Sequence, residues 1–221
     1  MKSKFWQSAL CATGLAAAMA APALAAVVTV DFEGAGLTNL YFANESFTQN
    51  GFKMTVDFDA GIVDSAIALG PNAPTGNASQ FYSGLNDGGL IVERSDGGLF
   101  DLLGFDAAFI PLSPAASGTT VIVAVSGNFG IAWNFLGSSS SRFPFGRYDD
   151  PADFANFSQV RQIEFFACSF DGTNVCTAPT LNNGQFAIDN INLGFVPEPG
   201  SLALVALSLL GLAATGRRSA C

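Results

Sequence analysis

Strand signals dominate the chain between Ala26 and Phe195, and helical periodicity is almost absent there. Short runs rich in Val, Ile and Phe are separated by clusters of Asn, Asp, Gly, Pro and Ser that are typical of turns. The pattern predicts strands over residues 27–33, 51–58, 90–94, 100–109, 119–126, 129–135, 160–168 and 185–195. Short strands at this spacing predict an all-β domain over residues 26–195, built as an antiparallel β-sandwich.

Side-chain parity within these strands predicts which face is buried. In residues 129–135 the large apolar side chains share one parity, so Trp133 is expected to face the core rather than a ligand. In the last strand the parity changes at Asp189 and Asn190, which predicts a β-bulge there. Better candidates for stacking on a sugar lie near loop signals, namely Tyr41, Tyr82 and Tyr148.

Two cysteines, Cys168 and Cys176, flank a turn signal at the end of a predicted strand. A disulfide across this hairpin-like loop is their simplest use in an oxidising compartment, where it would add about 2–3 kcal/mol of stability. Metal binding by these two residues is not expected, because the chain contains no histidine to complete such a site.

The first 25 residues have the features of a secretory signal peptide. Lys2 and Lys4 precede an apolar run over residues 9–20, and small residues follow at 23 and 25. We expect a signal helix that signal peptidase removes between Ala25 and Ala26. A permanent N-terminal anchor is the alternative, but the run is shorter than the roughly 20 residues that a spanning helix needs.

The last segment, residues 196–221, combines a proline-rich start with an apolar stretch and a basic end. Pro197, Glu198 and Pro199 cannot continue a strand ladder and are followed by residues 201–216, which carry no charge. Leu202 to Ala214 predicts a hydrophobic helix that covers only about 20 Å of a hydrocarbon core about 30 Å thick. We expect the final arginine pair, Arg217 and Arg218, to stay in the cytoplasm.

This arrangement of Pro197, Glu198, Pro199, a short apolar helix and Arg217-Arg218 resembles the PEP-CTERM sorting tail of Gram-negative bacteria. The resemblance implies recognition by the membrane protease exosortase and export together with extracellular polysaccharide. It also implies a precursor held transiently at the inner membrane, then a product at the cell surface or in the extracellular matrix. Removal of the tail near the motif follows the logic of other discarded anchors, and a permanent C-terminal anchor is the alternative.

Composition removes several classes of function. Without histidine the chain cannot form a serine-hydrolase triad, an imidazole base or a histidine-ligated zinc site. Residues 26–199 hold 5 basic and 18 acidic side chains, a net charge of −13. Such a surface repels phosphate backbones, so nucleic acid is not an expected partner, whereas calcium suits it.

Carboxylates lie at the end of the first predicted strand, as Asp31 and Glu33, and in the last one, as Asp189. A first strand with Asp-Phe-Glu and a last strand with Ile-Asp-Asn-Ile resembles the jelly-roll fold of carbohydrate-binding modules. The resemblance implies that the two ends of the domain pair and that Asp31, Glu33 and Asp189 hold a structural calcium ion. Solvated carboxylates at strand ends are the alternative.

The leading interpretation of function is a non-catalytic protein whose sandwich binds or organises extracellular polysaccharide outside the cell. The second is a secreted glycan-active enzyme that uses two carboxylates, with candidates at Asp149, Asp150, Asp153 and Glu164. No spacing selects a pair among them, so catalysis is not expected. Ice binding is a weaker third interpretation, because the sequence lacks arrays of regularly spaced threonines.

Overall fold

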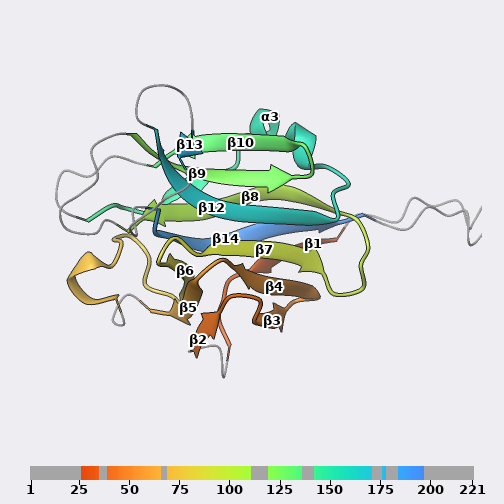
Figure 1. Ribbon diagram of the computed structural model, residues 1–221. Coiled ribbons are helices and arrows are strands. Elements are labelled where there is room, and N and C mark those ends of the chain that lie inside the picture. The colour runs from red at the N-terminus through yellow and green to blue at the C-terminus, as the bar shows by residue number, and fades with distance from the viewer. Residues whose placement is uncertain are drawn as a thin grey trace, which may run out of the picture. The chain divides into compact units, whose positions relative to one another are not determined.

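Two antiparallel β-sheets lie face to face and form a sandwich (Figure 1). The computed structural model describes residues 26–34, 39–65, 69–110, 119–135, 142–170, 176–177 and 184–196. Within these residues the predicted all-β sandwich is confirmed. The two predicted flanking helices lie outside them, as do Ala25, Pro197, Glu198, Pro199, Arg217 and Arg218.

The first sheet, named the β14 sheet, has the strand order β11-β8-β14-β6-β5-β2, and β1 also pairs with β14. Its strands are β1 (Val27–Val30), β2 (Asn39–Phe42), β5 (Ala60–Asp64), β6 (Phe81–Leu85), β8 (Phe100–Phe109), β11 (Gly146–Tyr148) and β14 (Phe186–Phe195).

The second sheet, named the β12 sheet, has the order β10-β9-β12-β7-β4-β3, and β13 pairs with β12. Its strands are β3 (Ser46–Gln49), β4 (Phe52–Asp57), β7 (Gly89–Arg94), β9 (Thr119–Ser126), β10 (Phe129–Asn134), β12 (Gln162–Phe170) and β13 (Cys176–Thr177).

Helical elements are short in the described part of the chain. They are the 3-10 helices η1 (Gly70–Asn72) and η2 (Ala155–Phe157) and the α-helix α3 (Pro151–Phe154). No helix in these ranges is long and apolar enough to cross a membrane.

The core lies between the sheets because the inward-facing positions of both are apolar. Phe105 of β8 is its aromatic centre, and its ring lies 5.2–6.0 Å from the rings of Trp133, Tyr148, Phe154 and Phe165. Trp133 is only 8% exposed, which confirms its predicted place in the core.

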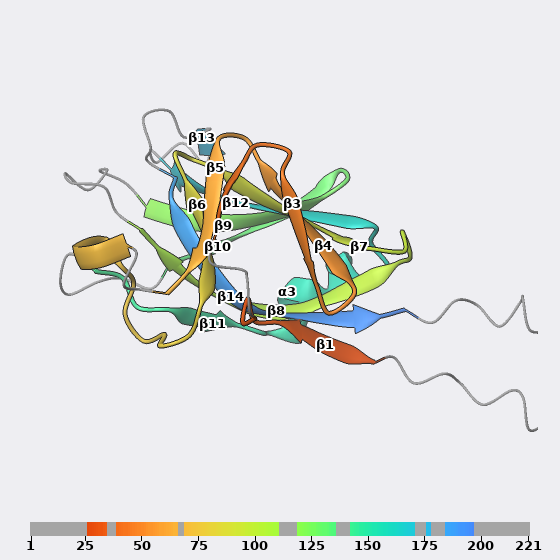
Figure 2. The same ribbon diagram turned by 90° about the horizontal axis from the view of Figure 1, so that it is seen from below.

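The two ends of the described domain meet in one sheet. Strand β1 pairs antiparallel with β14, with Val27 opposite Gly194 (Figure 2). The predicted bulge is also confirmed, because the β14–β8 register shifts after Asp189 and Asn190 has a φ of 49°. Asp189 is thereby held opposite Asp106 of β8.

Candidate functional site

Two of the three predicted calcium ligands, Glu33 and Asp189, contact one segment of the chain, residues 77–80, at separate points. Glu33 Oε1 accepts a hydrogen bond from the backbone N–H of Gln80 at 2.7 Å. Asp189 Oδ2 accepts from Asn77 Nδ2 at 2.6 Å and from Ser79 Oγ at 3.0 Å. These two carboxylates therefore fasten the segment to the first and last strands of the domain.

The third predicted ligand, Asp31, is also occupied by donors. Its Oδ1 accepts from Gln49 Nε2 at 2.7 Å and from the backbone N–H of Glu33 at 3.1 Å. Among the residues that the structure describes, no group of three or more histidine, cysteine, aspartate or glutamate side chains could hold a metal ion. Calcium binding by Asp31, Glu33 and Asp189 therefore stays a prediction, and hydrogen bonds within the chain already occupy part of the acceptor capacity of each carboxylate.

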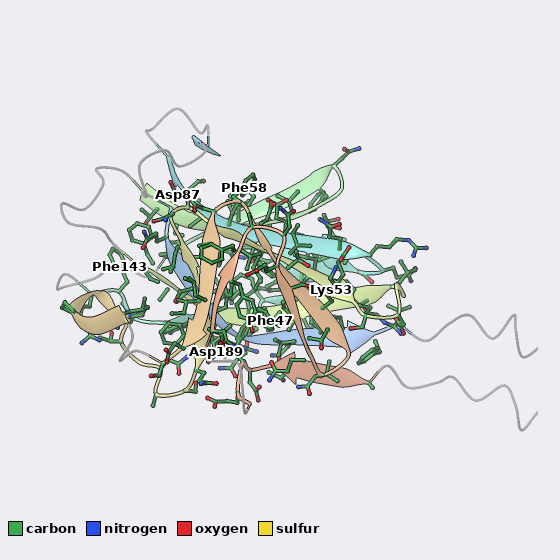
Figure 3. The ribbon with its side chains drawn as sticks, turned by 60° about the horizontal axis from the view of Figure 1, so that its bottom comes forward. Phe47, Lys53, Phe58, Asp87, Phe143 and Asp189 are labelled. Atoms are coloured by element: carbon green, nitrogen blue, oxygen red, sulfur yellow. The ribbon has the colours of Figure 1, made fainter. Side chains whose placement is uncertain are left out.

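Asp189 lies fully buried in β14 (Figure 3). Burial raises the pKa of its carboxyl to about 6, although hydrogen bonds from Asn77, Asn190 and Ser79 lower it, and the nearby Asp106 charge raises it further. These hydrogen bonds connect Asp189 of β14 to Asn77 and Ser79, far away in the sequence.

Of the three tyrosine candidates for sugar stacking, Tyr82 belongs to the core. It is fully buried and donates to the Gly89 carbonyl at 2.7 Å, so its ring cannot meet a sugar. Tyr41 and Tyr148 are partly buried: Tyr41 packs on Phe47 with ring centroids 4.8 Å apart, and Tyr148 stacks on Phe105 at 5.2 Å. Sugar stacking by Tyr41 or Tyr148 stays a prediction.

Three of the four candidate catalytic carboxylates have structural roles. Asp149 forms an ion pair with Arg147 at 3.2 Å, and Asp150 caps α3 by accepting from the backbone N–H of Ala152 at 3.0 Å. Asp153 accepts from Trp133 Nε1 at 2.8 Å. The fourth candidate, Glu164, lines an open pocket.

Cys168 of β12 is fully buried and disulfide-bonded. The backbone of Cys176 in β13 lies opposite Phe170, two residues beyond Cys168, while its side chain lies outside the described residues. The pairing of Cys168 with Cys176 stays a prediction.

The outer face of β12 carries the candidate functional site. Ile163, Phe165 and Ala167 point into the core, so alternation places Glu164 and Phe166 on the opposite face. Phe166 is only partly buried and packs against an apolar cluster formed by Val121, Val123 and Cys168. We name this surface, with Asp57 and Gln162, the Glu164 face.

Glu164 and Asp57 of β4 form an acidic pair on this face. Burial raises the pKa of Glu164, and the charge of Asp57 and the hydrogen bond to it raise it further. Asp57 lies opposite Gly89 of β7, and Glu164 lies opposite Ile91, two residues further along the same strand.

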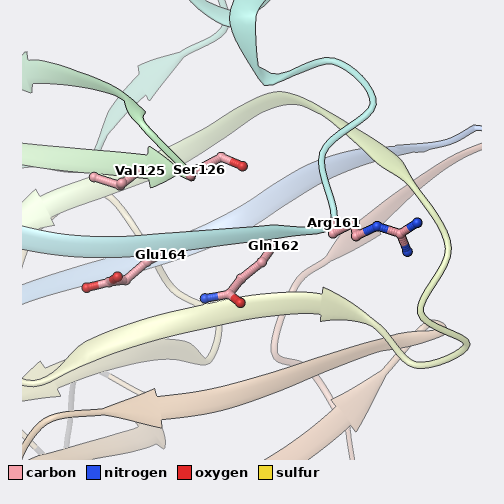
Figure 4. Close-up of a pocket in the computed structure, with 6 residues that line it drawn as sticks. Val125, Ser126, Arg161, Gln162 and Glu164 are labelled. Carbon is pink, nitrogen blue, oxygen red and sulfur yellow. The ribbon is translucent and has the colours of Figure 1, made fainter.

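An open pocket of about 470 Å³ adjoins this pair (Figure 4). It is lined by Val125, Ser126, Gly127, Arg161, Gln162 and Glu164. The lining combines hydroxyl, amide, guanidinium and carboxyl groups on one flat face, which suits a ligand with many hydroxyl groups.

The sequence analysis selected Glu164 as a candidate. It did not select Phe166, and it did not predict that Asp57 lies near Glu164. Alternation within residues 160–168 places Phe165 and Phe166 on opposite faces of the strand, so the sequence alone could have identified Phe166 as an outward-facing aromatic residue. The pairing carried no local signal, because Asp57 and Glu164 come from strands far apart in the sequence.

Residues 195–218 match the family model of the PEP-CTERM protein-sorting motif. The chain carries a PEP-CTERM sorting motif. The match confirms the resemblance drawn from Pro197, Glu198 and Pro199. It implies that exosortase processes the protein and sorts it to the cell exterior.

The body is similar in fold to a crystal structure of a DUF4465 family protein from Bacteroides caccae. The TM-score is 0.50 and the identity 12%, over 76% of this chain and 98% of that one. At this identity the likeness concerns the fold alone. No curated protein sequence matches the chain.

Proposed function

We propose that the protein is a non-catalytic polysaccharide-binding protein of the cell surface or extracellular matrix, and that the Glu164 face binds the glycan. The PEP-CTERM motif supports the export. The proposal extends to a Gram-negative host, in which the precursor is held at the inner membrane until exosortase acts on it.

One observation carries the binding proposal: an incompletely buried aromatic ring lies on a flat outer sheet face beside hydrogen-bonding groups. Phe166 neighbours Glu164 on β12. On the β7 side, Phe165 lies opposite Leu90, which faces the core, and the next residue is Gly89. No large side chain from β7 therefore stands beside the ring, so a sugar could stack on it while its hydroxyls reach the pocket.

Geometry favours binding over hydrolysis. Glycosidases hold their two carboxyl groups about 5–10 Å apart so that a glycosidic bond fits between them. Asp57, the acid that interacts with Glu164, projects from the same outer sheet face as Glu164 rather than from the opposite side of a cleft. Asp149, Asp150 and Asp153 are committed to an ion pair, a helix cap and Trp133.

The test is a glycan array with the purified protein, followed by titration calorimetry on the strongest ligand. Phe166→Ala should weaken binding about tenfold, the result of losing about 1.4 kcal/mol of stacking. Phe42→Ala is the matched control, because Phe42 is 57% exposed on β2, at the edge of the other sheet. Equal affinity of the Phe166 variant and the wild type would reject this face as the site.

A reducing-sugar assay on the same ligand tests the non-catalytic part of the proposal. We expect no release of sugar from any ligand that binds. Turnover that Glu164→Gln abolishes would instead identify an enzyme.

A further inference from the structure

The residue before the Pro-Glu-Pro sequence is held by a clamp of side-chain and backbone contacts from the folded body. Val196 directly precedes Pro197, the first residue of the Pro-Glu-Pro sequence. Its carbonyl accepts a hydrogen bond from Arg94 Nη1 at 3.3 Å, and its N–H donates to the Leu99 carbonyl at 3.4 Å. Arg94 Nη1 also donates to that Leu99 carbonyl at 2.9 Å. One guanidinium therefore connects the turn after β7 to the end of β14.

The same arginine covers the preceding residue. The Arg94 guanidinium carbon lies 4.7 Å from the centre of the Phe195 ring, in cation–π geometry. Phe195 packs on Phe52 with ring centroids 5.2 Å apart, and its N–H donates to the Ala26 carbonyl at 2.8 Å. Phe195 and Val196 are therefore fixed by their backbones and, at Phe195, by the ring as well.

The turn that follows Arg94 is built to hold its side chain. Asp96 forms an ion pair with Arg94, and this hydrogen bond holds the pKa of Asp96 below its usual range. A Cβ at Gly98 would lie 2.6 Å from the guanidinium carbon, so only glycine leaves room for it. The Arg94 side chain is 11% exposed as a result. We name Arg94, Asp96 and Leu99 the Arg94 clamp.

The clamp lies where both processing junctions meet. Ala26, the residue after the expected signal cleavage, lies beside Phe195 at the paired ends of β1 and β14 (Figure 2). Proteases bind the residues around a scissile bond in extended form through backbone hydrogen bonds. At Phe195 and Val196 those backbone groups are already taken.

We propose that the Arg94 clamp sets the N-terminal limit of sorting cleavage. The sorting protease cuts on the C-terminal side of Val196, and every residue through Val196 stays with the folded body. Arg94 is a positioning residue in this step: it withholds Phe195 and Val196 from the protease and presents the motif at the edge where the signal peptide is also removed.

The experiment produces the full precursor in a host that contains exosortase and measures the intact mass of the processed body. The wild type should give a product that retains Val196. Arg94→Ala should give additional products cut before Val196. Lys53→Ala is the control, because it removes one positive charge from an exposed pair on β4, and its product should match the wild type.

Two results would overturn the proposal: a wild-type product that lacks Val196, or an Arg94→Ala product with the wild-type terminus. If thermal unfolding shows that Arg94→Ala does not fold, a second variant decides. A short Gly-Ser spacer inserted between Val196 and Pro197 leaves the clamp intact and should speed processing several-fold. An unchanged processing rate of the spacer variant would then reject the clamp as the limit.

Discussion

Replacing Asp189 with asparagine should make the stability of the body less dependent on pH. Asp189 is completely buried, and its carboxyl pKa is raised from the ordinary 3.8 to about 6. The folded state thus binds the proton more tightly than the unfolded chain does. The stabilising contribution is fully present below about pH 4 and is lost as pH rises through about 6.

The size of the effect follows from the two pKa values. A difference between 3.8 and about 6 corresponds to at most about 3 kcal/mol of folding free energy. Asparagine resembles the protonated acid in shape and charge, so Asp189→Asn should gain on the wild type by about 2 kcal/mol between about pH 4.5 and about pH 8, the remainder being lost below pH 4.5. The asparagine amide accepts the hydrogen bonds from Asn77 and Ser79 less well than the carboxyl does. This loss lowers the stability of the variant at both pH values, so it drops out when the two stability differences are subtracted.

Urea unfolding of both proteins at the two pH values measures this change. Asp59→Asn, which removes an exposed carboxylate from the turn between β4 and β5, is the control for the loss of one charge. A stability difference between Asp189→Asn and the wild type that stays constant within about 0.5 kcal/mol would refute the reasoning. It would mean that the hydrogen bonds to Asp189 offset the cost of its burial.

Phe105→Ala should destabilise the body by about 3–5 kcal/mol in denaturant unfolding, because it leaves a cavity among four packed rings. Gly84→Ala should cost at least about 2 kcal/mol, since its Cβ would lie 2.1 Å from the Gly88 carbonyl oxygen; a smaller loss would show that the backbone can shift. Asp150→Ala should cost about 1 kcal/mol through loss of the hydrogen bond to the Ala152 N–H, and Asp150→Asn should restore most of it. Melting with calcium and with a chelator tests the predicted ligands Asp31, Glu33 and Asp189: a rise of several degrees with calcium supports the site, and a change within about 1 °C rejects it.

Much of the fold could be predicted from the sequence, because strand formation depends on the alternation of neighbouring residues. Burial on one face imposes a period of two, so long strands such as β8 and β9 were predicted within a residue of their ends. The bulge at Asp189 appeared as a break in that period. The sorting motif was also legible, because it is recognised as a linear sequence.

Short strands escaped prediction for physical reasons. In β6 four of the five residues are buried, so both faces are covered and no alternation remains. In β2 most residues are exposed at a sheet edge, and its apolar residues Leu40 and Phe42 face solvent. Without a buried face on one side, such a segment carries no periodic signal.

The sequence by itself determined the sandwich class, the core position of Trp133 and the sorting motif at the end of the chain, since each depends on neighbours along the chain. Tertiary structure alone decided the site. The register of β4, β7 and β12 places Asp57 opposite Gly89 and Glu164 opposite Ile91, on the same outer face of the sheet. Packing between distant strands buried Tyr82 and left Phe166 partly open, because exposure depends on which segments cover a face rather than on the residue itself.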